Sequence, residues 1–133
     1  MLRRWLPAGM LVAVGIALAY AAGPLALIVP VALAAALSPL AFPRSVPATE
    51  ARRRSAADGK PIVYWRPGCP YCLRLRATVG LRAHRAHWVD IWRDPDGAAA
   101  VRAVAAGNET VPTVILAGEP LVNPDPRRIR AAL

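Results

Sequence analysis

The sequence predicts an α/β domain, with a mixed four-stranded sheet, preceded by a transmembrane helical hairpin. Three observations support this prediction. No charged residue occurs between Leu6 and Phe42, a stretch of 37 positions. After residue 58, short apolar runs rich in β-branched and aromatic residues alternate with stretches of helical periodicity. The two cysteines, Cys69 and Cys72, fall between the first such run and the first such helix.

The charge distribution indicates what kind of partner the chain meets. The 133 residues carry a formal net charge of +9, with +5 in residues 1–57 and +4 in residues 58–133. The arginines of the first part flank the uncharged stretch, a placement that favours an anionic membrane surface. No basic stripe interleaved with aromatic residues occurs elsewhere, so we expect a membrane partner and no nucleic acid.

The uncharged stretch is too long for one comfortable membrane crossing, which takes about 20 helical residues at ~1.5 Å each. Gly23-Pro24 is a turn signal near its middle. We therefore predict that residues 1–42 form two transmembrane helices, over about 5–22 and 25–42. A secretory signal cleaved after Ala19-Tyr20-Ala21 and a single tilted span are the alternatives.

Arginines also predict the orientation of these spans. They precede the uncharged stretch at Arg3 and Arg4 and follow it at Arg44 and over residues 52–54. Because lysine and arginine favour the cytoplasmic side, we expect a multi-pass protein of the cell membrane with both ends in the cytoplasm. Residues 43–58, with two prolines and many charges, are predicted to be a surface linker before a domain over 59–133.

The domain is predicted from its alternating elements. Four apolar segments are typical of strands: Pro61–Trp65, His87–Trp92, Thr113–Leu116 and Leu121–Val122. Three helices are expected, starting at Pro70, at Pro95 after an Asp94 cap, and at Asn123-Pro124. The order β-α-β-α-β-β-α makes the first two strands parallel through a right-handed crossover and the last two antiparallel. Helices are expected on both faces of the sheet.

The cysteine pair admits three interpretations. Cys69, Cys72, His84 and His87 form C-x2-C-x11-H-x2-H, but the histidine spacing is short for a zinc finger, so no metal site is predicted. A structural disulfide would close a very small loop and stabilise little. A redox pair remains, and it fits the position directly before a helix.

Redox chemistry is favoured by the electrostatics of a helix start. The unpaired N–H groups and the helix dipole there stabilise a Cys69 thiolate. Arg66, with Arg74 or Arg76, adds positive charge. Cys72 lies one turn later on the apolar face, where it is less exposed and able to attack a mixed disulfide on Cys69.

Two motifs resemble those of glutaredoxins. Residues 69–72, CPYC, resemble the glutaredoxin dithiol motif, and residues 110–113, TVPT, resemble the TVP motif of that family. The stretches GNETVPTV and LVNP are similar to actinobacterial glutaredoxin-like proteins, which include mycoredoxins. The resemblance covers residues 59–133. It implies a thioredoxin fold and a thiol-disulfide oxidoreductase without a tightly bound cofactor.

The resemblance also implies roles for individual residues. Cys69 would be the nucleophile and Cys72 the resolving thiol. Arg66 matches the basic residue that holds a substrate carboxylate, and Tyr71 would lie at the rim of the site. The bond between Val111 and Pro112 would be cis, and this pair would present the Val111 backbone to a bound thiol or peptide.

The expected co-substrate is a low-molecular-weight thiol, either mycothiol or glutathione. Glutathione-using members carry an acidic pair after the fourth strand, where this sequence has Asn123-Pro124-Asp125-Pro126. The departure is compatible with mycothiol. Disulfide-bearing proteins, membrane proteins among them, are the expected partners. The alternatives are a thioredoxin-like protein-disulfide exchanger and a module that binds a [2Fe–2S] cluster.

Overall fold

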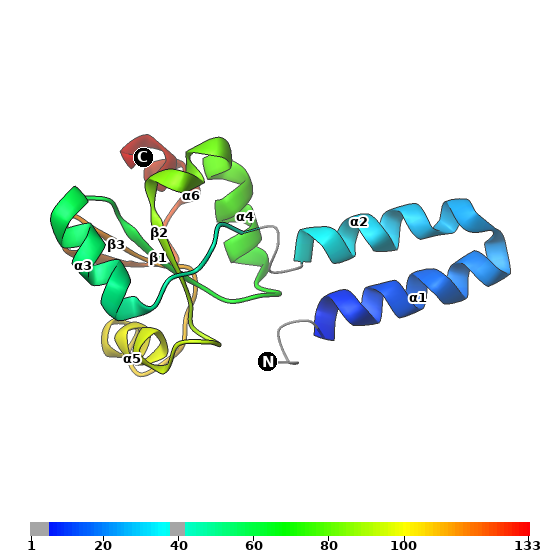
Figure 1. Ribbon diagram of the computed structural model, residues 1–133, viewed down its shortest axis with the longest axis horizontal. Helices are drawn as coiled ribbons and strands as arrows, with labels where there is room; N and C mark the ends of the chain where they lie inside the picture. The colour runs from blue at the N-terminus through cyan, green and yellow to red at the C-terminus, as the bar shows by residue number, and fades with distance from the viewer. Residues whose placement is uncertain (1–5, 38–41) are drawn as a thin grey trace. The chain divides into compact units, whose positions relative to one another are not determined.

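The computed structural model describes residues 6–37 and 42–133 (Figure 1). The chain separates into two compact units, Met1–Ala41 and Phe42–Leu133. The first is helical, and the second contains the sheet.

The N-terminal unit is a pair of helices. Helix α1 spans Leu6–Ala22, a 3-10 turn η2 spans Pro24–Leu27, and α2 spans Ile28–Leu37. Gly23 lies between them with φ 93°, a backbone conformation that glycine adopts without strain. A Cβ at Gly15 would lie 2.9 Å from the Cβ of Pro30, so this glycine lets α1 approach α2 closely. The turn expected at Gly23-Pro24 is confirmed.

Among residues 6–37 and 42–133, no helix is both long enough and apolar enough to cross a membrane. The predicted spans over 5–22 and 25–42 are therefore unsupported; α1 has 17 residues, and α2 has 10 because residues 24–27 form the 3-10 turn. Positions 5 and 38–41 of those spans lie outside the described residues. Phe42, expected at the end of the second span, is buried in the C-terminal unit, where its ring stacks on Trp65 at 3.8 Å.

The linker predicted over residues 43–58 is wrong for most of its length. Helix α3 occupies Ala48–Asp58 and packs against the sheet. Its inner face consists of two fully buried alanines, Ala48 and Ala51, while residues 52–54, all arginine, are exposed. Two alanines give only a weak hydrophobic pattern for a helix. The charged composition of residues 43–58 therefore suggested a linker.

The sheet has the predicted mixed topology. Its strands are β1 (Ile62–Trp65), β2 (His87–Asp90), β3 (Thr113–Leu116) and β4 (Glu119–Val122), in the order β2-β1-β3-β4. β1 is parallel to β2 and antiparallel to β3, and β3 is antiparallel to β4. β2 ends two residues earlier than predicted, because residues 91–93 form a turn.

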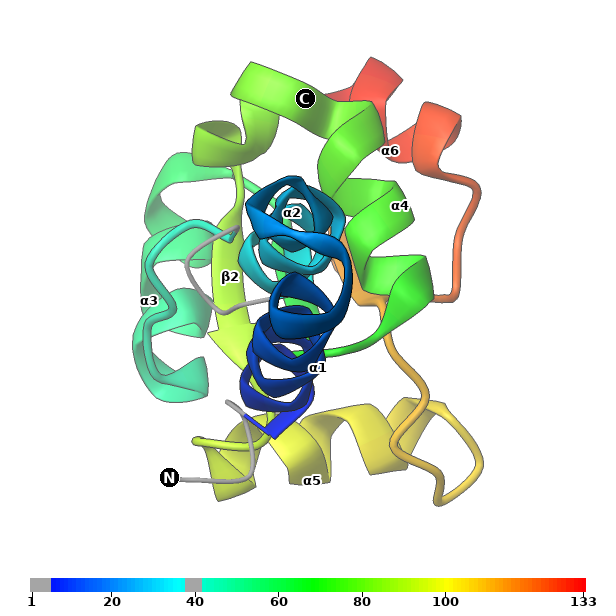
Figure 2. The ribbon, with the colours of Figure 1, turned by 90° about the vertical axis from the view of Figure 1, so that its right-hand side faces the viewer.

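Helices cover both faces of this sheet, as expected. α4 spans Pro70–Val79 and continues as the 3-10 helix η4 over Gly80–Arg85; α5 spans Pro95–Val104 and α6 spans Pro126–Ala132. α4 contacts α6, α3 contacts α5, and Figure 2 shows α3 and α4 on opposite sides of β2. The α/β architecture is consistent with a thioredoxin fold. The start of α4, where both cysteines lie, directly follows the central strand β1.

Candidate active site

The nucleophile predicted from the sequence lies at the junction of β1 and α4. β1 ends at Trp65, a turn through Gly68 (φ 76°) follows, and Cys69 is the N-cap of α4. Pro70 occupies the first position of the helix, where no N–H donor is needed. This local sequence therefore holds the Cys69 side chain over the free N–H groups of the first helical turn.

Cys69 is surrounded by groups that stabilise its thiolate. The pKa of Cys69 is lowered from 9.0 to about 6, first by a hydrogen bond from the Cys72 thiol. The backbone N–H groups of Cys72 and Tyr71 and the charge of Arg66 lower it further, while burial opposes them. The Cys72 N–H lies 3.3 Å (N to Sγ) from the acceptor sulfur. At neutral pH, Cys69 is therefore mainly a thiolate.

Cys72 has the opposite chemistry. It is fully buried, and its pKa is raised by its hydrogen bond to Cys69 and by burial. Neither cysteine forms a disulfide in this structure. The pair therefore consists of an anionic sulfur at the helix start and a protonated sulfur one turn inside it.

Of the three arginines expected to act on Cys69, only Arg66 contributes to its lowered pKa. The guanidinium of Arg76 donates to Gly80 O at 2.8 Å, at the opposite end of α4. Arg74 is exposed one turn beyond Tyr71 and lines a different groove. Helical spacing alone does not show which basic side chains turn toward a helix start.

The TVP motif meets the nucleophile in space. The Cys69 sulfur lies 3.4 Å from Val111 O, although the two residues are 42 positions apart. The bond between Val111 and Pro112 is cis, as the resemblance implied. The Thr113 hydroxyl donates to Thr110 O at 2.8 Å, and Asn123 N–H donates to Pro112 O at 2.8 Å. These bonds fix the loop that carries Val111.

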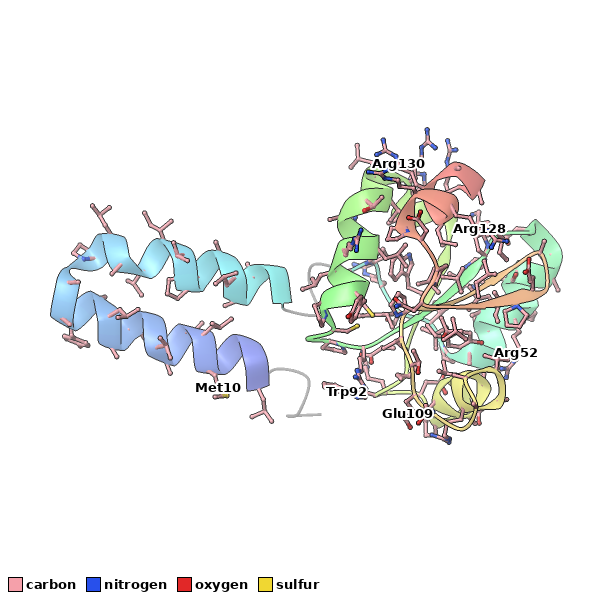
Figure 3. All side chains as sticks on the ribbon, turned by 180° about the vertical axis from the view of Figure 1, so that it is seen from behind. Met10, Arg52, Trp92, Glu109, Arg128 and Arg130 are labelled. Carbon is pink, nitrogen blue, oxygen red and sulfur yellow. The ribbon has the colours of Figure 1, made fainter. Side chains whose placement is uncertain are left out.

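One open groove of about 490 Å³ contains Cys69 and most of the predicted substrate-binding residues. Arg66, Tyr71 and Val111 line it, whereas Pro112 is buried and does not. Five further lining residues were not predicted as site residues: Asn108, Glu109, Thr110, Asn123 and Pro70. The first three directly precede Val111 in the sequence, a signal that could have found them. Glu109 (labelled in Figure 3) pairs with Arg102 of α5 at 2.6 Å.

A second groove adjoins the first. It has a volume of about 410 Å³, and Tyr71 and Asn123 line both grooves. Its other lining residues are Arg74, Pro124, Asp125, Pro126 and Arg127. Tyr71 is 57% exposed, so its ring forms a ridge between the two grooves. This second groove was not predicted, because α4 and α6, which supply its arginines, are far apart in the chain.

No cluster of three or more histidine, cysteine, aspartate or glutamate residues that could hold a metal occurs in the described part of the chain. His87 Nε2 lies 3.1 Å from each carboxylate oxygen of Asp58, and His84 Nδ1 faces Leu81 O. The C-x2-C and H-x2-H pairs are thus parts of different local structures.

Comparison with known proteins agrees with this geometry. The profile of the family described as Glutaredoxin matches residues 62–121. Two Mycobacterium tuberculosis proteins, each named "Putative glutaredoxin" and drawn from strains CDC 1551 and H37Rv, are 38% identical to the chain over 72 residues. The match covers 53% of this chain and 86% of each relative. The chain belongs to the glutaredoxin family. No solved structure matches it significantly.

As a member of the glutaredoxin family, the protein is a thiol-disulfide oxidoreductase. Its two cysteines have the geometry that this chemistry needs. Attack on a disulfide requires a thiolate, which Cys69 supplies. The family acts with thiols of the glutathione type as co-substrates. Cys69 lines the open groove of about 490 Å³ together with Arg66, Tyr71 and Val111.

Proposed function

We propose that this glutaredoxin reduces mixed disulfides between proteins and a low-molecular-weight thiol. The Cys69 thiolate attacks the sulfur of the small thiol, a new disulfide forms on Cys69, and the protein thiolate leaves. A second thiol molecule attacks this intermediate, restores Cys69 and leaves as the small-molecule disulfide. The lowered pKa of Cys69 supports this assignment, because the first step, attack on the mixed disulfide, needs a thiolate.

The other predicted residues are proposed to hold the small thiol. When glutathione is the bound molecule, Arg66 at the groove wall pairs with one of its carboxylates. Tyr71 packs against it from the rim, and the backbone of Val111 pairs with it as an added strand would. Pro112 acts from beneath the groove by shaping the loop that carries Val111.

Mycothiol and glutathione are both proposed as co-substrates. Glutathione carries a γ-glutamyl amine, and the segment after β4 offers only Asp125 as an acid. The Asp125 carboxylate already accepts the N–H of Arg127 at 2.9 Å. This arrangement favours mycothiol, which lacks that amine.

Intact mass spectrometry tests both the nucleophile and the thiol. The Cys72→Ser variant is exposed to mycothiol disulfide and, in parallel, to glutathione disulfide. We expect one adduct per chain, mapped to Cys69, that forms faster with mycothiol disulfide. If Cys69 stays unmodified with both while it still alkylates rapidly, the small-thiol proposal is wrong.

A second candidate is direct reduction of protein disulfides by both cysteines, which the proximity of Cys72 to the Cys69 sulfur favours. Here Cys72 attacks the protein–Cys69 disulfide, and the pair itself becomes oxidised. Steady-state turnover of the Cys72→Ser variant separates the two candidates. A mixed-disulfide reductase keeps its turnover, whereas a dithiol exchanger loses it.

We also propose that residues 1–42 attach the protein to the cell membrane, with the redox domain on the cytoplasmic side. The large apolar residues of α1 and α2 support this, because many are exposed, such as Met10 at 69% and Leu25 at 78%. Fractionation with a carbonate wash tests attachment, and a reporter active only outside the cytoplasm, fused after Leu133, tests the side. Release by carbonate contradicts attachment, and reporter activity contradicts the orientation.

A further inference from the structure

A basic surface lies at the opposite end of α4 from Cys69. η4, which continues α4, and the last turn of α6 contain Arg82, Arg85 and Arg130 and no acid. The guanidinium groups of Arg82 and Arg85 donate to backbone oxygens at the end of α6, at 3.0 Å and 2.8 Å, so the two elements lie together. Figure 3 shows Arg130 at the outer end of α6 among other nitrogen-tipped side chains. These three arginines and Leu81, the neighbour of Arg82, define the η4 face.

The positive charge of the η4 face is not balanced by acids in the described part of the chain. No carboxylate there forms a salt bridge with any of its three arginines. Asp58 pairs with His87, the second residue after η4, and Glu119 pairs with Arg128 of α6. Hydrogen bonds to carbonyl oxygens leave the charge of a guanidinium in place. The η4 face therefore attracts an anionic partner.

η4 also exposes a large apolar side chain beside these charges. A 3-10 helix has three residues per turn, so residues three apart share one of its sides. Ala83 is buried, Arg82 and Arg85 share the side toward α6, and the third side consists of Leu81 and His84. Leu81 is 92% exposed, whereas no other large apolar side chain described in the C-terminal unit exceeds 57%. An apolar side chain surrounded by cations is typical of surfaces that enter the membrane interface.

The chain enters the domain on the side of the sheet that carries η4. The ring of Phe42 lies 5.8 Å from that of Trp88, centroid to centroid, and the Trp88 indole N–H donates to Ala83 O of η4 at 2.8 Å. Residues 38–41 are all that separates Phe42 from the end of α2 in the sequence. With residues 1–42 attached to a membrane as proposed, the η4 face therefore stays within reach of the bilayer.

We propose that the η4 face docks on the anionic phospholipid surface of the membrane. Its arginines pair with lipid phosphates, and Leu81 enters the interfacial layer. The proposal goes beyond the redox function and rests in part on the proposed attachment, which brings the domain to the bilayer. α4, with 10 residues, separates the η4 face from Cys69 by about 15 Å of helix. Docking thus leaves the groove of Cys69 open to partners in solution.

Quenching of a fluorescent label by lipid tests this contact. The full chain with Cys69→Ser and Cys72→Ser carries the dye NBD on Leu81→Cys, the η4 label. A matched chain carries it on Ala57→Cys, the α3 label, which is exposed on the other side of β2 from α4 (Figure 2). Each chain is added to preformed vesicles of phosphatidylcholine, alone or with about one-third phosphatidylglycerol as the anionic lipid. Spin-labelled phosphatidylcholine in both vesicles quenches the dye on contact.

The η4 label is expected to be quenched about fivefold more in anionic than in neutral vesicles, since one arginine near an anionic surface adds about fivefold to binding. The α3 label should show no such difference. Salt near 1 M should remove the effect, because it screens charges beyond about 3 Å. Arg82→Gln with Arg85→Gln should also remove it, whereas Arg82→Lys with Arg85→Lys should retain it. Arg53→Gln with Arg54→Gln, the matched control, removes the same charge from α3 and should keep it.

Flotation of the vesicles separates this proposal from the attachment. A chain that floats with neutral vesicles is attached without the help of anionic lipid. If its η4 label is then quenched no more than its α3 label in anionic vesicles, the docking proposal alone is wrong. If the chain floats only with anionic vesicles and the η4 label is quenched there, docking is supported and attachment through residues 1–42 is contradicted.

The remaining outcomes concern what the arginines recognise. Equal loss of quenching in the two glutamine double variants shows an effect of net charge alone and overturns the proposal. So does a loss that the lysine variant shares, because the arginines then act by holding the end of α6. If the η4 label responds to polyglutamate but not to anionic vesicles, the face serves an acidic protein and the proposal is wrong. Circular dichroism of each variant separates these results from misfolding.

Discussion

The starts of α4 and α5 are built on the same local plan. Each begins with a capping side chain, and proline occupies the first helical position. The capping atom accepts hydrogen bonds from backbone N–H groups of the first turn. At α5 the cap is Asp94, whose carboxylate oxygen accepts from Asp96 N at 3.0 Å and Gly97 N at 3.2 Å. At α4 the cap is Cys69, whose sulfur accepts from Cys72 N at 3.3 Å.

The two helix starts differ mainly in the chemistry of the capping atom. A carboxylate is already an anion at neutral pH, so its hydrogen bonds stabilise the start of α5 and create no reactive group there. A thiol is ordinarily neutral, so the same N–H groups lower its pKa and make it a nucleophile. In this fold a structural device, the helix cap, thus becomes a reactive centre when sulfur replaces oxygen.

Cys69→Ser tests that distinction with the largest expected effect. Serine is a good helix cap, so the helix start should be retained, but its hydroxyl does not ionise near neutral pH. We expect no adduct with any disulfide and no measurable turnover, with a urea midpoint close to that of the wild type. Residual turnover would show that Cys72 can replace Cys69 as the nucleophile.

Cys72→Ala tests which neighbour contributes most to the lowered pKa. The hydrogen bond from the Cys72 thiol is the largest contribution at Cys69, so its removal should raise the pKa of Cys69 from about 6 toward the ordinary value. The pH midpoint of iodoacetamide alkylation reports that pKa directly. Below its midpoint each protein loses reactivity as the thiolate is protonated, so the variant curve should lie at higher pH. An unchanged midpoint would assign the effect to the backbone N–H groups instead.

Arg66→Gln should move the same midpoint upward by less, because the Arg66 charge is the smallest of the contributions that lower the pKa of Cys69. Loss of the charge-assisted hydrogen bond to a carboxylate should also weaken binding of glutathione disulfide roughly tenfold, seen as a higher KM. Arg93→Gln is the matched control, since Arg93 is exposed and lines neither groove beside Cys69. Equal effects of the two variants would exclude a specific role for Arg66.

Much of the domain could be predicted from local signals in the sequence. The β-formers of residues 62–65 and 113–116, the Asp94-Pro95 helix start and the CPYC motif each act within a few residues, and each has the expected place in the structure. The contact of Val111 with Cys69 joins residues 42 positions apart, and only the family resemblance indicated it.

The wrong predictions concern segments whose packing cannot be inferred from their composition. α3 packs through two alanines in an otherwise charged segment, so its pattern resembled a linker. Phe42 continued an apolar stretch in the sequence, yet it stacks on Trp65 of the domain. The second groove depends on where α4 and α6 meet, and no local pattern encodes the meeting of two helices.

Asp94→Ala should leave the chemistry unchanged and affect stability alone. Loss of the cap should lower the free energy of unfolding by about 1–2 kcal/mol. Asp94 also accepts the N–H of Ala48, which joins α5 to α3, so the loss should lie in the upper part of that range. Urea unfolding measures it, with Asp96→Ala as the matched control, because Asp96 lies in the same first turn but is not the cap.

The alkylation midpoint of Cys69 should stay in place in both variants. A shifted midpoint in Asp94→Ala would show that the two helix starts are coupled, and the comparison between them would then fail.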